Sequence, residues 1–326
     1  MTTTGKILKR RLVVAIAFSL LYAWRLMHYL SNSASFNMLA AEGAMYNAGP
    51  ALAAFTTDKK KATNKTSYAL VVVACKAGMD WLLDVPKEWR VIVFEKCGPT
   101  IGASMSINAS YTKAKMLSLL SHVEFRAIEN FASEECTGYF DYIMEFYHNL
   151  TDITVFMQDD GLIPYSKYTD YASMHSPFHN FSQVADATQR FLTPSLSNQS
   201  AERGFLHFGV REIKEPWGKD GYHGKAQQAL WPFFATQENP NPPQTHTFKT
   251  SANMAVRKER ILLRPWDVYR GLKRHIYHSR HVIDGIGDAR QYCCAMERQW
   301  HMLFGEPPAL PRNSMVTHLL NPDAEE

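Results

Sequence analysis

The sequence predicts an α/β protein with a single, mainly parallel-sheet domain of the Rossmann-like kind, preceded by an N-terminal transmembrane helix. Two observations predict the domain. Apolar segments of strand length alternate with helical segments, and each apolar run is continuous, as in strands that helices cover on both faces. A third observation predicts the membrane helix: a long apolar run follows a basic flank near the N-terminus.

The N-terminal part divides into a short cytoplasmic tail at 1–11 and a signal anchor at 12–30. The anchor is long enough to span a bilayer, which takes about 17–25 residues. Because the basic flank is expected to stay in the cytoplasm, the protein is expected to be single-pass type II, with its bulk in the lumen of the Golgi or endoplasmic reticulum. The alternative is a cleaved signal peptide with its cut site in "SNSAS".

Sequons and cysteines fit a lumenal domain. Residues 31–65 are rich in Ala, Ser and Asn, and we interpret them as a stem or linker. Chance gives about two N-x-S/T acceptor patterns, whereas this sequence has them at Asn64, Asn108, Asn149, Asn180 and Asn198. Five cysteines allow at most two internal disulfides and leave one over. The sequence has no CxxC pair, which argues against a structural zinc site.

The elements of the predicted domain, 66–312, follow in order. Four apolar runs indicate parallel strands at 67–74, 89–96, 123–130 and 153–158. Helices are expected at 113–122 and 133–149, the second beginning at a serine N-cap. The strand at 153–158 is so apolar that we expect it to be central in the sheet.

The later elements are less regular. A helix is expected at 181–192 and a short strand at 203–209, followed by a Gly-rich aromatic loop at 215–224. A strand that runs into a turn is expected at 245–256, with helices at 265–277 and 288–304. Residues 313–326 are interpreted as a tail.

Two adjacent carboxylates, Asp159 and Asp160, end the segment "ITVFMQDD". Ligands of open α/β sheets bind outside the carboxyl ends of the strands, where this pair is expected. Neighbouring carboxylates repel each other unless a cation or hydrogen-bond donors compensate, and their oxygens suit Mn²⁺ or Mg²⁺ bridging a diphosphate. The alternative is a solvated turn, because "DDG" is also good turn chemistry.

Other residues are candidates for contacts with a substrate. Lys76 follows the first strand and is a candidate to stabilise a leaving diphosphate. Glu297 and His301 have the spacing of one helix face, and they are candidates for a base and a ligand contact. The alternative for this pair is a structural hydrogen bond. Four tryptophans are candidates to stack on sugar rings, although tryptophans more often lie in the core: Trp217, Trp231, Trp266 and Trp300.

Several function classes are excluded or unsupported. The net charge of +4 is too small to indicate nucleic-acid binding, and the basic residues form no stripe. The sequence has no G-x-S-x-G motif of a serine hydrolase, no P-loop and no G-x-G-x-x-G.

Parts of the sequence resemble an uncharacterised eukaryotic family, a domain of unknown function. The resemblance rests on Glu135, on Tyr139 four residues later, on Tyr142 with Ile143, and on "VFMQ". Two later segments, 255–269 and 296–305, resemble the closing segments of that family.

A more distant resemblance is to GT-A-type glycosyltransferases, whose nucleotide-sugar lies over the strand ends with its diphosphate bridged by a metal on a D-x-D motif. The resembling positions are Asn130, Glu135, Asn253, Met254, Arg290, Glu297 and Arg298. The sequence departs from that motif, because "QDDG" has no strict D-x-D, although Gln158 and Asp160 hold the matching spacing.

The resulting hypothesis is a glycosyltransferase of the secretory pathway that uses a nucleotide-sugar and a glycan or protein acceptor, with Mn²⁺ or Mg²⁺. Glu297 and Asp160 are the candidate catalytic residues, Asp159 and Asp160 the metal ligands, and the candidate substrate-binding residues are Lys76, Glu135, Asn253 and His301. We expect the acidic pair to face a cleft shared with Glu135, Asn253 and Glu297. The alternative is a non-catalytic lumenal protein of the same fold that binds glycans or a partner.

Overall fold

The protein is described by a computed structural model that covers nine segments of the chain. The described residues are 65–75, 80–96, 118–128, 135–162, 176–193, 203–219, 221–236, 239–279 and 289–320. The expected cytoplasmic tail, anchor and most of the stem lie outside them, as do Lys76, Asn130 and three sequons, Asn64, Asn108 and Asn198. Within the described residues, no helix combines the length and the apolar character that a membrane crossing requires.

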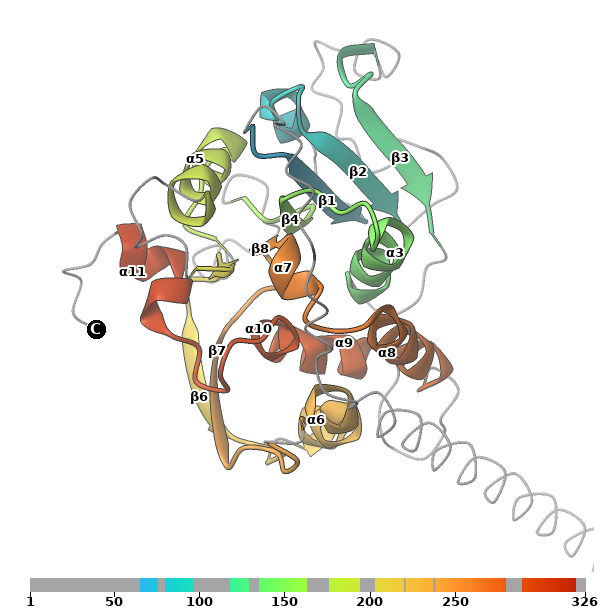
Figure 1. The fold of residues 1–326 in the computed structure, drawn as a ribbon, viewed down its shortest axis with the longest axis vertical. Coiled ribbons are helices and arrows are strands. Elements are labelled where there is room, and N and C mark those ends of the chain that lie inside the picture. The colour runs from blue at the N-terminus through green and yellow to red at the C-terminus, as the bar shows by residue number, and fades with distance from the viewer. Residues whose placement is uncertain are drawn as a thin grey trace, which may run out of the picture. The chain divides into compact units, whose positions relative to one another are not determined.

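A six-stranded sheet forms the centre of the domain, in the order β3-β2-β1-β4-β8-β5 (Figure 1). Its strands are β1 (Tyr68–Ala74), β2 (Arg90–Glu95), β3 (Val123–Ala127), β4 (Ile153–Gln158), β5 (Phe205–His207) and β8 (Met254–Arg257). The first four strands are parallel, and β8 runs antiparallel to both of its neighbours. The prediction of a mainly parallel sheet is therefore confirmed, and β4 lies inside the sheet as expected.

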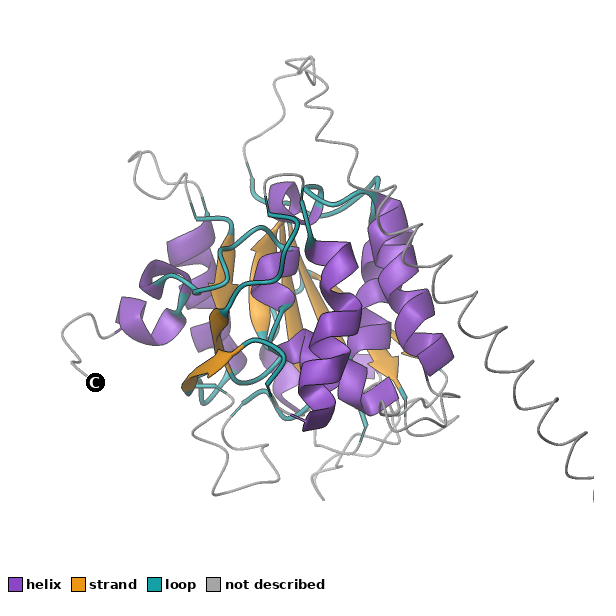
Figure 2. Ribbon diagram, turned by 90° about the horizontal axis from the view of Figure 1, so that it is seen from below, coloured by secondary structure: helices purple, strands orange, loops and turns teal. Residues whose placement is uncertain are grey.

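Helices cover both faces of this sheet (Figure 2). Helix α3 (Cys136–Phe146) packs on one face, where Gly138 brings its backbone so close that an added Cβ would lie 2.4 Å from Val73. The other face carries the short 3₁₀ helix η1 (Asp80–Asp84) and α5 (Phe181–Leu192), whose aromatic rings stack on one another. Because both faces are covered, β1 and β4 are apolar without alternation.

The remaining elements lie outside the six-stranded sheet, and α11 (Val316–Leu320) packs with η1 and α5 through Val316. Helices α6 (Gly221–Phe234), α8 (Trp266–Ser279) and α9 (Ala289–Glu297) pack on one another, and α8 also packs on α3 (Figure 1). Strands β6 (Glu212–Pro216) and β7 (Thr245–Lys249) form a separate antiparallel pair. Four short elements complete the domain: α7 (Lys258–Ile261), α10 (Trp300–Leu303), η3 (Arg312–Ser314) and α11 (Val316–Leu320).

Several predicted elements differ from the structure. Helix α3 begins at Cys136, with Glu135 and not the expected serine at its N-cap. The loop expected at 215–224 contains the end of β6, a turn at Gly218 with φ +68°, and the start of α6. The segment 245–256 divides into β7 and β8, which belong to different sheets. The helix expected at 288–304 is broken between Glu297 and Trp300, and the tail expected after 312 contains η3 and α11, with Met315 buried and bridged to His207.

Candidate functional site

The chain changes direction across the sheet between β1 and β4, which makes this the topological switch point. From β1 the chain builds outwards through β2 to β3, and then returns to place β4 on the other side of β1. The strand order therefore reverses between β1 and β4, and open α/β sheets bind ligands outside the carboxyl ends of the strands at such a point. The residues that follow these two strands are Cys75 and Asp159.

Asp159 joins the two strand ends. Its Oδ2 accepts a hydrogen bond of 2.8 Å from the backbone N–H of Cys75, and its own N–H donates to the Val73 carbonyl. Trp81 donates its indole N–H to the Asp159 carbonyl over 3.3 Å. With 7 % of its surface exposed, Asp159 is buried, so the alternative of a fully solvated turn is wrong for this residue.

Four carboxylates lie around the buried ring of Tyr139 on α3. Burial raises the pKa of Tyr139 well above its usual value, and the charges of four nearby carboxylates raise it further: Glu135, Asp160, Asp159 and Glu297. The phenol therefore stays protonated at neutral pH. Its hydroxyl has no hydrogen-bond partner among the described residues, and it is fully buried. The structure thus brings together four of the acids that the sequence singled out.

A chain of side-chain hydrogen bonds connects Glu135 to the end of β4. The Gln158 amide donates to Oε2 of Glu135 over 3.0 Å, and the backbone N–H of Gln158 donates to Oδ1 of Asn253 over 2.8 Å. Glu135 and Asn253 are both buried. The amide oxygen of Asn253 therefore satisfies a backbone donor of β4.

The turn between β7 and β8 extends this chain to Glu297. The backbone N–H of Asn253 donates to Oγ of Ser251 over 2.9 Å, and the N–H of Ser251 donates to Oε1 of Glu297. Ser251 is buried with φ +88°, a conformation that costs a non-glycine residue about 1–3 kcal/mol. The surrounding contacts hold this strained turn at the candidate site, with Glu297 half-buried at the end of α9.

A group of three possible metal ligands in the described residues lies elsewhere than the two aspartates. The ligand atoms of Glu135, Cys136 and Cys293 lie within 4.8 Å of one another. Cys136 and Cys293 form a disulfide, so they do not bind a metal in this state. A Mn²⁺ or Mg²⁺ site needs fewer protein ligands, because one or two carboxylates together with substrate phosphates suffice. Asp160, which is half-buried, fits that limited role.

His301 lies apart from the acids. It belongs to α10, which starts three residues after the last residue of α9, so the prediction that Glu297 and His301 share one helix face is wrong. Its ring Nε2 lies 3.3 Å from the Pro308 carbonyl, and burial lowers its pKa to about 3. The helix breaks because Gln299 leaves helical geometry, with φ −123° and ψ −5°.

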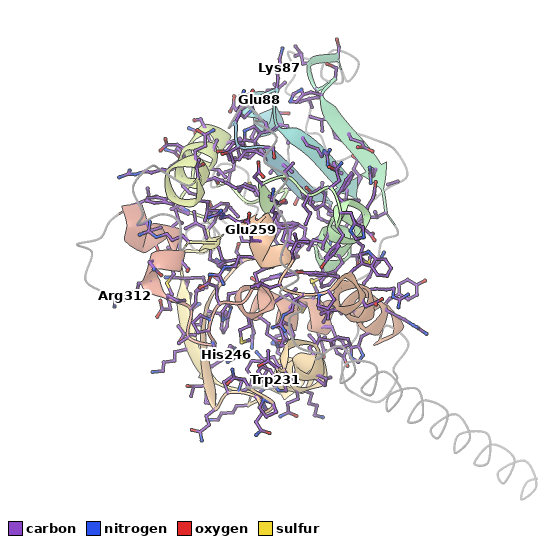
Figure 3. The ribbon with its side chains drawn as sticks, viewed as in Figure 1. Lys87, Glu88, Trp231, His246, Glu259 and Arg312 are labelled. Atoms are coloured by element: carbon purple, nitrogen blue, oxygen red, sulfur yellow. A yellow bond between two sulfur atoms is a disulfide. The ribbon has the colours of Figure 1, made fainter. Side chains whose placement is uncertain are left out.

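The tryptophans mostly pack within the protein. Trp300 is fully buried against Phe304, and Trp217 packs edge-on against Trp231 and His246. Figure 3 labels Trp231 on α6 and His246 on β7, the two residues against which Trp217 packs. A stacking role for these rings on a sugar stays a prediction.

Two sequons lie in the described residues. Asn149 is exposed just after α3. Asn180 is the N-cap of α5, and its Oδ1 accepts from the N–H of Gln183 over 3.1 Å. Both positions are compatible with a glycan on the side-chain nitrogen.

Sequence patterns missed Ser251, and they did not show how Cys75 and Tyr139 contribute to this site. Ser251 gives no local signal, because its role depends on a turn between two sheets. Cys75 contributes through its backbone N–H, which no pattern of side chains can indicate. Tyr139 was detectable as part of the resemblance, but its burial among acids required the packing of α3 on the sheet.

Comparison with known proteins agrees with the resemblance to an uncharacterised family. Neither a curated protein nor a solved structure matches the chain. A family model described as "Protein of unknown function (DUF3431)" matches residues 121–317, which is more than half of the chain. This match begins just before β3 and includes α3, β4, the turn at Ser251 and Glu297. The chain therefore belongs to the DUF3431 family of proteins of unknown function.

Proposed function

We propose that this domain transfers a sugar from a nucleotide-sugar to a glycan or protein acceptor, with the donor bound over the carboxyl ends of β1 and β4. The observation that carries the proposal is the coincidence of the topological switch point with Asp159, Asp160, Glu135 and Glu297. Open α/β sheets bind nucleotides at such points. The GT-A resemblance of the sequence supports the same substrate class.

The two aspartates are assigned different tasks. Asp159 is buried and accepts a hydrogen bond from the N–H of Cys75, so it holds the carboxyl ends of β1 and β4 together. Asp160 is half-buried and would hold Mn²⁺ or Mg²⁺ together with the diphosphate oxygens of the donor. The bound cation supplies compensation for the charge that develops on the leaving diphosphate. Lys76 follows β1 in the sequence and is the candidate for a second positive charge.

Glu297 is the candidate base. One of its carboxylate oxygens is held by the N–H of Ser251, which orients the group at the end of α9. In the proposed step the acceptor hydroxyl oxygen bonds to the anomeric carbon of the sugar, and its proton passes to Glu297. The bond from that carbon to the diphosphate breaks, and the nucleoside diphosphate leaves with the bonding electrons.

The disulfides support the proposed lumenal location. Cys136 is bonded to Cys293, and Cys75 is also in a disulfide. Disulfides persist mainly in oxidising compartments such as the secretory pathway. The type II anchor at 12–30 belongs to the same proposal, and it rests on the sequence alone.

Replacement of Glu297 by Gln tests the proposed function. The variant should still bind a nucleoside diphosphate with Mn²⁺, since Gln keeps an oxygen for the N–H of Ser251, but it should lose at least about 100-fold of the sugar-transfer rate. The measurement is release of the nucleotide (UDP, GDP or CMP) from a panel of UDP-, GDP- and CMP-sugars with mixed glycan acceptors. Equal rates of nucleotide release by the wild type and by Glu297→Gln would show that Glu297 is not the base.

A non-catalytic binding protein is the second candidate, and one observation favours it. Glu135, Asp159 and Asn253 are buried and engaged in hydrogen bonds that hold the fold together. A protein that had lost catalysis would keep such contacts. Calorimetry separates the two candidates, because a failure of the wild-type protein to bind UDP, GDP or CMP with Mn²⁺ supports the second.

A further inference from the structure

We propose that reduction of the Cys136–Cys293 disulfide opens a buried binding site for Zn²⁺ or a similar thiophilic cation, formed by the two cysteine sulfurs and the carboxylate of Glu135. The proposal does not depend on the proposed sugar transfer. It starts from three residues, all buried, whose ligand atoms already lie within 4.8 Å of one another.

The geometry of these atoms is close to that of a zinc site. Zn–S bonds of about 2.3 Å and Zn–O bonds of about 2.1 Å in a tetrahedron place neighbouring ligand atoms about 3.5–4 Å apart. Oε1 of Glu135 already lies 3.5 Å from Sγ of Cys293. The two cysteines have their Cα atoms 5.7 Å apart, so small side-chain rotations bring their sulfurs to the required separation once the bond is broken.

The chemistry of the donor set selects the cation. Two thiolates favour borderline or soft cations such as Zn²⁺, whereas Mg²⁺ and Mn²⁺ prefer oxygen ligands. This site therefore differs in kind from the oxygen-rich surroundings of Asp160. A water molecule would complete four-coordination, as it does in zinc sites with three protein ligands.

The opening step balances with a dithiol reductant as co-reactant. The reductant gives two electrons and two protons to Cys136–Cys293 and becomes a disulfide itself. Zn²⁺ then binds the two sulfurs and releases the two thiol protons to solvent. Because the oxidised pair offers no thiolate, occupancy of the site depends on the redox state.

The site is placed where it would act on the acids of the switch point. Glu135 accepts the amide of Gln158 at the end of β4. Cys293 precedes Glu297 by four residues on α9, so the two residues lie on the same face of one helix. A cation that draws Glu135 and Cys293 together would therefore shift Glu135 and Glu297, two of the four carboxylates near Tyr139.

Cys294 provides the matched control. It is a thiol, half-buried, next to Cys293 in the chain, but it is not part of the three-residue group. A cation held by surface thiols would need Cys294, whereas a cation in the proposed site would not. The variants are therefore Cys294→Ser as control, with Cys293→Ser and Glu135→Gln as disruptions.

The experiment titrates Co²⁺, and then Zn²⁺ in competition, into the full chain after reduction and removal of the reductant. Thiolate-to-Co²⁺ charge transfer in the near ultraviolet reports sulfur ligation, and circular dichroism reports folding. Reduced wild type and Cys294→Ser should bind one equivalent with this band, and the oxidised protein should show none. Cys293→Ser should lose the band, and Glu135→Gln should weaken binding at least about tenfold, since even outer-shell partners of metal ligands contribute that much.

Two results would overturn the proposal. One is an unchanged band in Cys293→Ser, which would place the cation on other thiols, such as those released from the disulfide of Cys75. The other is a reduced wild type that binds no Co²⁺. If reduction unfolds the chain, Zn²⁺ should restore the folded signal in wild type but not in Cys293→Ser, because a metal that binds only the native site stabilises it. Failure of that rescue also contradicts the proposal.

Discussion

Asp159 and Asp160 are neighbours in the chain, yet their environments differ. Asp159 is buried, and its carboxylate accepts the N–H of Cys75 at the end of β1. Asp160 is half-buried beside Tyr139, among the other carboxylates. A buried acceptor bonded to backbone contributes to folding, whereas a carboxylate among like charges does not.

Asp159→Asn should therefore destabilise the protein. The Asn amide can keep one oxygen for the Cys75 N–H, but its NH₂ group replaces a buried acceptor with a donor, at a cost of about 1–3 kcal/mol in the free energy of unfolding. Urea unfolding measures the effect. Asp160→Asn is the control and should change stability by no more than about 0.5 kcal/mol, or raise it. Equal losses in the two variants would mean that both acids are structural.

Three buried histidines make stability depend on pH. Burial lowers the pKa of His207 and His301 from 6.5 to about 3, and that of His246 to about 4. Protonation therefore favours the unfolded chain. The contribution of these neutral rings to the free energy of unfolding is fully present above about pH 6.5. It falls as the pH drops towards the pKa values of the folded state, by up to about 1.4 kcal/mol per pH unit for each histidine.

The expected result is a urea midpoint that decreases steadily as the pH falls from 7 to 4. His301→Gln should make this decrease shallower, because Gln keeps a donor for the Pro308 carbonyl but does not titrate. His148→Gln, which changes an exposed histidine, should leave the slope unchanged. A slope that is the same in wild type and His301→Gln would contradict burial of a neutral ring.

At the scale of elements, the packing of α3 on the sheet determines where Glu135 and Tyr139 lie. The helix approaches β1 and β2 at Gly138, where an added Cβ would lie 2.4 Å from Cγ2 of Val73 and 3.2 Å from Cβ of Phe94. At an open helix position, Gly→Ala stabilises by up to about 1 kcal/mol. At Gly138 the close approach makes the same change destabilising.

Gly138→Ala should lower the free energy of unfolding by about 1–3 kcal/mol, because the extra methyl group forces α3 away from the sheet. The matched test is the same change in a Val73→Ala background, which removes the atom that the new Cβ meets. There the cost of Gly138→Ala should be smaller, which is a favourable coupling in a double-mutant cycle. Additive effects would mean that this contact does not set the distance between α3 and the sheet.

The elements that sequence patterns predicted are those whose own residue pattern reflects their burial on the sheet. The apolar runs of β1 and β4 and the amphipathic α5 match their expected positions, because their periodicity is set by burial on the sheet. The break between α9 and α10 was not predicted, since residues on both sides of it form helix readily. Helix α6 was missed because its glycines resemble a loop, although Gly224 is required by its contact with Gly218.

At the scale of the whole molecule, the order of the strands explains why distant residues meet. The strand ends of β1 and β4 meet because the chain returns across the sheet, and the turn at Ser251 reaches the same edge from β8. The sequence could place Asp159, Asp160, Glu135, Asn253 and Glu297 near strand or helix ends. It could not place Ser251 or separate the roles of the two aspartates, because both depend on long-range hydrogen bonds.

Occupied sequons would test the proposed lumenal location. Expressed as the full chain in a eukaryotic cell, the protein should migrate faster after endoglycosidase treatment. Asn149→Gln should remove one glycan without affecting stability, since Asn149 is exposed and outside the helices and strands. Gel mobility is the measurement, and unchanged mobility after the enzyme would contradict the secretory location.

The most direct test of the central claim is calorimetry of nucleoside diphosphate binding by Asp160→Asn. The wild-type protein should bind UDP or GDP only with Mn²⁺ or Mg²⁺, and Asp160→Asn should lose this metal-dependent binding while its melting temperature stays the same or rises. Asp267→Asn, which changes a partly exposed acid of α8 that pairs with Arg270, is the control and should bind as wild type does. Metal-dependent binding that survives in Asp160→Asn would contradict the assignment of the switch point as the nucleotide-sugar site.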